Sequence, residues 1–287
     1  MSREDDKRWL DLAGRAALRG RGLVEPNPCV GCALVDDAGR LVALGHHRRF
    51  GGAHAEVEAV RACRASGRDP RGLTVYCTLE PCGHTGKTGP CADMLIEAGV
   101  ARLVCARREP TALAGGGAAR LADAGIDVRF TDASPLATLV GAAHAKRAET
   151  GVPWVVAKWA QSRDGFVAGR GGDPRWLSNR LSRRQVHVLR ARVDAVIVGI
   201  GTVLADDPVL TARGVPVRRL ARRVVLDTAL RTPVSSKLVR SIGAPCSGGL
   251  TIFTDREAAE GARAEALREL GAEVIGIGLR DGRVDAG

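Results

Sequence analysis

Aromatic side chains are scarce in this sequence of 287 residues: one Tyr, four Trp and four Phe make up 3% of it. Proteins that bind unpaired bases stack them on aromatic rings, so this scarcity argues against a nucleic-acid partner. An apolar run of signal-peptide or membrane-span length is also missing, because the opening residues alternate charged and apolar side chains at helical spacing. We therefore expect a cytoplasmic protein that has no membrane partner and binds no nucleic acid.

A regular spacing of cysteines, which would indicate a disulfide framework, is absent as well. The eight cysteines are unevenly spaced and follow no export signal, so we expect reduced thiols, some of them metal ligands. The net charge of +11 fits nucleic acid, phosphorylated small molecules or simply an arginine-rich composition. The local run of Arg218, Arg219, Arg222 and Arg223 is interpreted as a solvated approach to a strand.

Apolar residues are plentiful enough for a sizeable core, since they make up 45% of the chain, and the length favours two domains. Alternating helical and strand patterns in the first half predict an α/β sandwich. Helices are expected at 5–19, from His54, at 92–98, at 118–124 and from Ser134 to Thr150, and strands at 30–35, 73–79, 102–106 and 126–130. We interpret the glycines at 115–117 as a loop. Gly151 and Pro153 mark the domain boundary, which gives domains 1–150 and 151–287.

A second α/β unit begins with the apolar run 154–160. A basic helix is expected at 182–191, a buried strand at 195–200, further strands at 223–226, 250–253 and 273–277, and a helix at 257–270. Gly199, Gly201 and Thr202 follow a strand as in dinucleotide-binding loops, but the third glycine is missing and the motif alone is weak.

The most specific motif is an H-A-E triplet followed by P-C and a second cysteine. His54, Ala55 and Glu56 precede Pro81 and Cys82, and Cys91 follows after eight further residues. Catalytic zinc sites hold three nitrogen or sulfur ligands and leave one position for water; His54, Cys82 and Cys91 supply three such ligands. The metal lowers the pKa of that water towards about 7. Glu56 is then placed to take its proton and deliver it to a departing amine, which predicts a hydrolytic deaminase with one Zn²⁺ per chain.

Two other interpretations of these residues stay open. Deaminases that edit flipped bases use the same chemistry, and the positive charge suits nucleic acid, but they separate their cysteines by two residues rather than eight. A structural zinc in a binding module needs four ligands, so Cys77 or Cys29 would have to complete the set. The cysteines outside the motif are otherwise interpreted as small core residues; they are Cys29, Cys32, Cys63, Cys77, Cys105 and Cys246.

The wider context of the motif resembles one family. PNPCVGCALV, GHHRRFGGAHAEVEAV and TLEPCGHTGKTGPCADMLIEAGVARLV are similar to three segments of the bifunctional riboflavin-biosynthesis deaminase–reductases, and together they cover most of residues 9–107. The resemblance implies a three-layer, cytidine-deaminase-like domain. It also implies that Asn27 hydrogen-bonds the substrate, that His47 lines the pocket, and that His84 and Lys87 meet the substrate phosphate. A simple turn role for Asn27 stays open, because Pro-Asn-Pro punctuates loops regardless of function.

The second half resembles the reductase domain of the same family, an α/β domain with a dihydrofolate-reductase-like fold. The similar segments are KWAQSRDGFVAG, HVLRARVDAVIVGIGTVLADDPVLTAR and VVLDTALRTP, in the family's order, over about 154–233. The resemblance implies NADPH as cofactor, a phosphorylated pyrimidine as substrate, and a homo-oligomer. It places Arg190, Leu210 and Arg213 at the substrate and assigns the cofactor to Ala160, Trp176, Thr202, Asp206 and Thr228.

Two departures concern this second half. The glutamate- and glycine-rich segment expected near the end of the reductase is missing before Gly287, which predicts an incomplete domain with an unpaired sheet edge. Pro174 replaces a polar residue just before Trp176 and removes a donor. The resemblance implies deamination of a phosphoribosylated diaminopyrimidine to the aminouracil, then NADPH-dependent reduction of the ribosyl group to ribityl. A deaminase with a vestigial reductase domain is the alternative.

Overall fold

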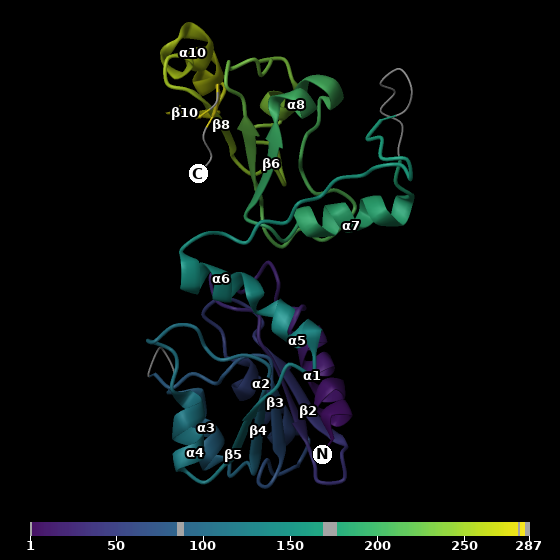
Figure 1. The fold of residues 1–287 in the computed structure, drawn as a ribbon, viewed down its shortest axis with the longest axis vertical. Coiled ribbons are helices and arrows are strands. Elements are labelled where there is room, and N and C mark those ends of the chain that lie inside the picture. Colours follow the sequence, from purple (N-terminus) through teal and green to yellow (C-terminus); the bar gives the residue numbers. More distant parts are fainter. Residues whose placement is uncertain (1, 85–88, 169–176, 281, 285–287) are drawn as a thin grey trace. The chain divides into compact units, whose positions relative to one another are not determined.

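The structure, a computed structural model, describes residues 2–84, 89–168, 177–280 and 282–284. The chain forms two compact units, Met1–Val156 and Ala157–Gly287, a few residues beyond the boundary that Gly151 and Pro153 suggest; the ranges 1–150 and 151–287 stay a prediction. Both units are α/β, as the sequence predicts (Figure 1). Across the described residues, every helix is too short or too polar to cross a bilayer.

The first unit is built on a five-stranded mixed sheet with the strand order β2-β1-β3-β4-β5. β1 pairs antiparallel with β2 and β3, whereas β3, β4 and β5 run parallel. The sequence predicted all of these strands except β2, whose short apolar run ends in Gly and His and has no clear period. The strands are β1 (Gly31–Val35), β2 (Leu41–His46), β3 (Thr74–Cys77), β4 (Arg102–Cys105) and β5 (Asp127–Phe130).

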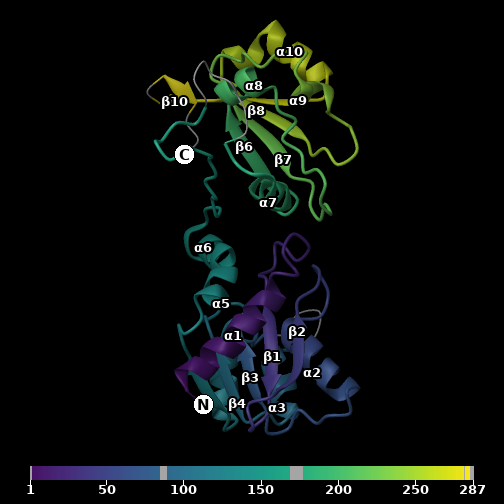
Figure 2. The same ribbon diagram turned by 90° about the vertical axis from the view of Figure 1, so that its right-hand side faces the viewer.

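Helices cover both faces of this sheet and give the predicted three layers (Figures 1 and 2). On one face lie α1 (Arg3–Ala17) and α5 (Pro135–Val140), and on the other α2 (Ala55–Ala65), α3 (Cys91–Glu97) and α4 (Gly117–Asp123). Successive side chains of a strand point to opposite faces. Cys32 and Leu34 of β1 therefore pack beneath α2, while Ala33 and Val35 pack beneath α1.

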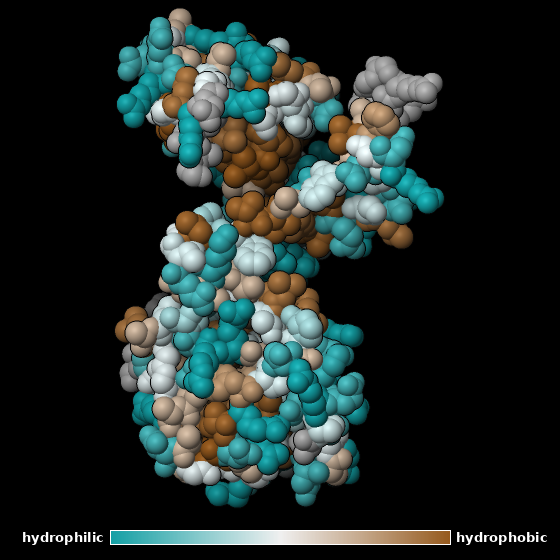
Figure 3. Space-filling model, viewed as in Figure 1, coloured by the Kyte–Doolittle hydropathy of each residue, from teal (hydrophilic) through white to brown (hydrophobic). Residues whose placement is uncertain are grey.

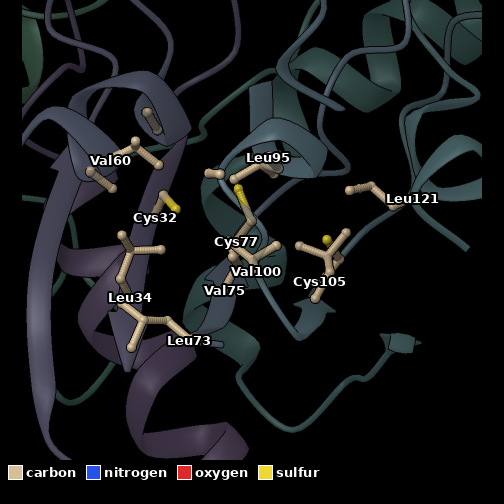
Figure 4. Packing of buried hydrophobic residues seen from close by; sticks show 14 of the residues in the cluster. Cys32, Leu34, Val60, Leu73, Val75, Cys77, Leu95, Val100, Cys105 and Leu121 are labelled. Atoms are coloured by element: carbon tan, nitrogen blue, oxygen red, sulfur yellow. The ribbon is translucent and has the colours of Figure 1, made fainter. Parts of the chain in front are cut away.

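Three cysteines from adjacent strands line the core beneath α2 and α3 (Figure 4). Cys32 is paired with Cys77, and Cys77 with Cys105, across the sheet. These three, with Cys29 and Cys63, are buried, as predicted for small core residues. The prediction was wrong for Cys246, which is exposed with a φ of 63°, because it lies in a turn that runs into Ser-Gly-Gly rather than in a core element.

The helix predicted from Ser134 to Thr150 is two helices, α5 and α6 (Ala142–Thr150), which meet at Gly141. The Ser134 hydroxyl caps α5 by accepting the backbone N–H of Ala137 at 3.0 Å. The same hydroxyl donates to the Asp11 carboxylate at 2.6 Å. This contact ties the start of α5 to α1 on the same face of the sheet.

The second unit holds a four-stranded parallel sheet with the order β6-β7-β8-β9. The sequence predicted its strands, which are β6 (Ala195–Gly199), β7 (Arg222–Leu226), β8 (Leu250–Asp255) and β9 (Glu273–Ile277). The basic helix is α7 (Arg180–Arg190), and the helix expected at 257–270 is divided at Gly261 into η2 (Ala258–Glu260) and α10 (Ala262–Glu269). Further short elements are α8 (Ile200–Asp206), α9 (Lys237–Arg240), β10 (Leu279–Arg280) and β11 (Arg283–Val284).

Two side chains of the second unit reverse the burial that their type suggests. Ile197 of β6 was expected inside but is 59% exposed, because β6 ends the row of strands and only Val196 and Val198 face the core. Figure 3 shows hydrophobic side chains on the surface of this unit. Arg223 was expected in solvent but is fully buried, because its guanidinium donates to the carbonyls of Leu238 and Gly248, which replace water.

The apolar run 154–160 forms neither helix nor strand.

Candidate metal and active site

The three predicted metal ligands converge on one face of the first sheet. His54 is the N-cap residue of α2, Cys91 is the first residue of α3, and Cys82 belongs to the loop between β3 and α3. Nδ1 of His54 lies 3.2 Å from Sγ of Cys91 and 3.6 Å from Sγ of Cys82. All three ligand atoms lie within 4.8 Å of one another. One ion at the usual zinc bond lengths of about 2.0–2.3 Å can contact all of them.

The two cysteines carry opposite pKa shifts. The Cys91 thiol and its backbone N–H, which lies 3.3 Å from Sγ of Cys82, together with His54, lower the pKa of Cys82 to about 4. The pKa of Cys91 is raised, because its thiol donates to Cys82 and is largely buried. The site therefore holds one thiolate and one thiol, and a cation with soft-ligand preference fits this donor set by displacing the remaining proton.

The ligand set is open rather than closed. Cys77 and Cys29, which would complete a structural four-ligand site, lie in the apolar cores on the two faces of the sheet. Among the described residues, neither joins the group of His54, Cys82 and Cys91. Three ligands with one open position are typical of a catalytic zinc site.

Glu56 lies beside this group, in the first turn of α2, and only 3% of it is exposed. Burial raises the pKa of Glu56 to about 7, and the charge of His54 opposes the shift. A divalent cation would also pull this pKa down. A carboxyl group that titrates near neutral pH can both accept and return a proton.

Asn27 and His47, predicted at the substrate, lie together next to the metal ligands. The His47 ring is buried and stands edge-on to the His54 ring, with centroids 5.6 Å apart. Burial lowers the pKa of His47, so the ring is neutral. Its Nδ1–H donates to the Ala53 carbonyl at 2.8 Å, which leaves Nε2 to accept the Asn27 amide at 3.3 Å. The Asn27 carbonyl oxygen is then the atom available to a ligand.

The two residues predicted to meet the substrate phosphate lie in the loop between the cysteines. His84 is half-buried, and its Nδ1 is buried with no hydrogen-bond partner among the residues that the structure describes. Such a nitrogen is a candidate for contact with a ligand. Lys87 lies outside the described residues.

In the second unit the structure brings Arg190 and Arg213 together and adds His187. The backbone N–H of Arg213 donates to Nδ1 of His187 at 3.2 Å, and Nη1 of Arg190 lies 3.5 Å from the Thr211 carbonyl. Burial and the charge of Arg213 lower the pKa of Arg190. An anion such as phosphate would relieve this repulsion. No sequence motif indicated His187, although it precedes Arg190 by three residues on one helix face.

Leu210, the third predicted substrate residue of this unit, is a core residue with an unusual backbone. It is 3% exposed and packs in the core cluster of the second unit. Its φ is 62°, and that of the nearby Asp207 is 39°. Left-handed conformations of residues other than glycine are strained and often occur at functional sites. The backbone of Leu210, rather than its side chain, is therefore the part able to meet a ligand.

The predicted cofactor residues come together only in part. An open hollow of about 690 Å³ lies at the carboxyl ends of β6 and β7, lined among others by Gly199, Gly201, Thr228 and Arg231. Parallel sheets bind ligands at this edge. Added Cβ atoms on Gly199 and Gly201 would meet no atom of the described residues within 4 Å, which leaves room for a nucleotide. Thr202 and Asp206 lie on α8, which begins at this edge. Ala160 does not line the hollow. Trp176 and Pro174 lie outside the described residues.

Two family models match the chain. Residues 3–107 match the cytidine and deoxycytidylate deaminase zinc-binding region, and residues 153–280 match the RibD C-terminal domain. The first range contains His54, Glu56, Cys82 and Cys91. The second contains the four-stranded sheet of the second unit and, except for Arg283, the residues that line its hollow. The cytidine-deaminase-like fold of the first half and the reductase-like fold of the second are thereby confirmed.

Whole-chain relatives agree with these matches. The riboflavin biosynthesis protein RibD of Aquifex aeolicus is 37% identical to this chain, over 96% of this chain and 74% of its own length. The RibD protein of Escherichia coli is 40% identical, over 80% of this chain and 62% of its own length. The chain thus spans 62–74% of the length of these two relatives. Acinetobacter baumannii RibD is structurally similar, with a TM-score of 0.75 at 34% identity over 97% of this chain and 75% of its own. A second similar structure is the diaminohydroxyphosphoribosylaminopyrimidine deaminase/5-amino-6-(5-phosphoribosylamino)uracil reductase of Thermotoga maritima. Its TM-score is 0.78 at 32% identity, over 96% of this chain and 82% of its own.

Proposed function

The chain belongs to the RibD family of riboflavin biosynthesis proteins, which join a zinc-dependent deaminase to a reductase, and we propose that it acts on the phosphoribosylated diaminopyrimidine for which the Thermotoga relative is named. The observation that carries this proposal is the convergence of His54, Cys82 and Cys91 within 4.8 Å, with Glu56 buried beside them. This is the arrangement that hydrolytic deamination requires.

In the proposed reaction, water replaces an exocyclic amine of the pyrimidine and ammonia leaves. Zinc held by His54, Cys82 and Cys91 supplies the charge that makes a water molecule nucleophilic at neutral pH. Glu56 accepts a proton from this water and passes it to the departing nitrogen, which leaves as ammonia. The water oxygen stays on the ring carbon as a carbonyl, and its second proton moves to the neighbouring ring nitrogen. The Asn27 carbonyl oxygen, oriented by the bond of its amide to His47, accepts a hydrogen bond from the pyrimidine. His84 and Lys87 meet the phosphate of the same substrate.

The second unit would hold the same phosphoribosyl group for reduction. Arg190 and Arg213 are the cations suited to its phosphate. His187, whose pKa is lowered by burial and by both arginines, lies beside them. The strained backbone at Leu210 faces the substrate. NADPH supplies a hydride when it is bound. Thr202, Asp206 and Thr228, with Ala160 and Trp176, would hold this cofactor, and Arg231 at the rim of the hollow adds a cation for one of its phosphates.

Location and assembly form the remaining part of the proposal. We infer a cytoplasmic homo-oligomer that binds no nucleic acid. The exposed apolar side chains Trp159 and Ile197 of the second unit support self-association, being 67% and 59% exposed. Light scattering on the purified protein, with and without RNA, tests the oligomeric state and the absence of RNA binding.

A coupled assay tests the function. Zinc-loaded protein is mixed with the phosphoribosylated diaminopyrimidine, and ammonia release and NADPH consumption are followed together. Ammonia release followed by NADPH loss is the expected result. Ammonia release alone would restrict the function to the deaminase and leave a vestigial second unit. Absence of both would contradict the proposal and direct attention to RNA as the deaminase substrate.

A further inference from the structure

The loop that carries Cys82 is held from outside the ligand set by residues 109–120. Glu80, two residues before Cys82, is 8% exposed. One carboxylate oxygen of Glu80 accepts the backbone N–H of Glu109 at 3.1 Å, and the other accepts that of Ala118, in the first turn of α4, at 3.0 Å. A buried carboxylate that accepts two N–H groups fixes the relative position of three chain segments.

Glycines let the backbone of α4 touch the backbone of this loop. A Cβ on Gly117 would lie 1.9 Å from the Pro81 carbonyl oxygen and 3.2 Å from the carbonyl carbon of Cys82. A Cβ on Gly83 would lie 2.7 Å from the Gly115 carbonyl oxygen. The Gly83 N–H also donates to the Ala114 carbonyl at 3.0 Å. The glycine cluster at 115–117 is therefore more than the simple loop that its composition suggests.

Arg120 of α4 connects the segments of both zinc cysteines. Its Nη1 donates to the Gly83 carbonyl at 2.7 Å, directly after Cys82. Its Nη2 pairs at 2.6 Å with Asp93, two residues after Cys91. The two charged side chains are 46% and 38% exposed, so this ion pair contributes little on its own. The buried Glu80 and the close contact at Gly117 carry most of the constraint.

We propose that Glu80, Gly117 and Arg120 form a clamp that sets the separation of Cys82 and Cys91, and that they are positioning residues for the metal. Zinc tolerates deviations of only about 0.2 Å in its bond lengths, and the described part of the Cys82 loop, residues 78–84 and 89–90, contains no strand or helix. The clamp rests on the proposed zinc function of the first unit. Gly117 and Arg120 lie beyond residue 107, where the match to the deaminase zinc-binding region ends, whereas Glu80 lies within that match.

Glu80→Gln tests the clamp, because the amide keeps one acceptor but turns an NH₂ group towards the second N–H. The control is Asp36→Asn, which alters another buried carboxylate that accepts a backbone N–H, from Arg40 at 2.8 Å, in the turn between β1 and β2. Zinc affinity is measured by competition with a chromophoric chelator, and the thiolate-to-metal absorption is recorded with Co²⁺. We expect Glu80→Gln to weaken zinc binding about tenfold or more and to shift the Co²⁺ spectrum. Asp36→Asn should leave both unchanged.

A second pair of variants decides the question if Glu80→Gln does not fold. Gly117→Ala forces the Cys82 loop to move, whereas Gly141→Ala adds a methyl group whose one neighbour within 4 Å among the described residues is the Arg107 side chain, at 3.8 Å. Arg120→Gln, at the surface, should shift the Co²⁺ spectrum with a smaller loss of affinity. Wild-type zinc affinity and spectra in Gly117→Ala and Arg120→Gln would overturn the clamp. Failure of the unaltered protein to bind zinc through His54 would instead overturn the proposed function.

Discussion

The amide nitrogen of Asn27 lies 3.3 Å from Nε2 of His47, whose other ring nitrogen lies 2.8 Å from the carbonyl oxygen of Ala53. Ala53 directly precedes the metal ligand His54. The Pro-Asn-Pro loop is therefore connected to the metal site through one neutral imidazole. Because His47 has only one acceptor nitrogen in this state, it orients the amide of Asn27 and points its carbonyl oxygen away from the ring.

Asn27→Ala should weaken substrate use without disturbing the metal. We expect kcat/KM for deamination to fall about tenfold. This factor corresponds to about 1.4 kcal/mol, which is close to the net contribution of one hydrogen bond. His47→Ala should have a similar effect, and the double variant should lose less than the sum of both, because the two residues act as a pair. Zinc content serves as the control. Fully additive losses would show that His47 does not act through Asn27.

Glu56→Gln should abolish deamination while zinc remains bound. Loss of a proton-transferring group costs about 10²–10⁴-fold in rate, and the amide cannot accept the proton of water. The matched control is Glu58→Gln on the same helix, since Glu58 pairs with Arg48 at 2.6 Å and lies outside the ligand group. Ammonia release and zinc content are measured together. Substantial activity of zinc-loaded Glu56→Gln would exclude Glu56 as the proton carrier.

Zinc uptake at neutral pH should release about one thiol proton, from Cys91, because Cys82 is already a thiolate with a pKa of about 4. The pKa of His54 is raised by its contact with Cys82. Because this pKa is raised, His54 becomes protonated as the pH falls, and zinc must then displace its proton as well. The number of protons released on zinc binding should therefore increase at acidic pH, and the zinc affinity should decrease. Calorimetry in buffers of different ionisation enthalpy counts these protons. Release of two protons at a pH well above the pKa of His54 would show that Cys82 is a thiol.

Arg223→Met should lower the free energy of unfolding of the second unit by about 1–3 kcal/mol, because the buried carbonyls of Leu238 and Gly248 lose their donor. The neighbouring Arg222 is exposed and pairs with Glu273 at the surface. Arg222→Met should therefore change stability by no more than about 1 kcal/mol. Urea unfolding followed by tryptophan fluorescence compares the two variants. Equal effects would contradict the structural role of Arg223.

Most elements of the first unit could be predicted because their periods are clear. The α1 pattern places Trp9 and Leu10 on one buried face, and strands such as Gly31–Val35 are continuous apolar runs. The second unit was predicted in its strands but not in its burial. Ile197 and Arg223 show why: the residue type reports a preference, while exposure depends on which strand lies at the edge and which carbonyls surround a charge.

The amino-acid sequence by itself determined the chemistry of this protein: the H-A-E and P-C motifs name the metal ligands and the proton carrier, because few residue types bind zinc and their order is specific. Tertiary structure alone decided how these residues are held. The neutral state of His47, the opposite pKa shifts of Cys82 and Cys91, the pairing of His187 with Arg213, and the contact of Gly117 with Pro81 all join residues distant in sequence. Their energies depend on burial and on distances of a few ångströms, which arise only when the chain is folded.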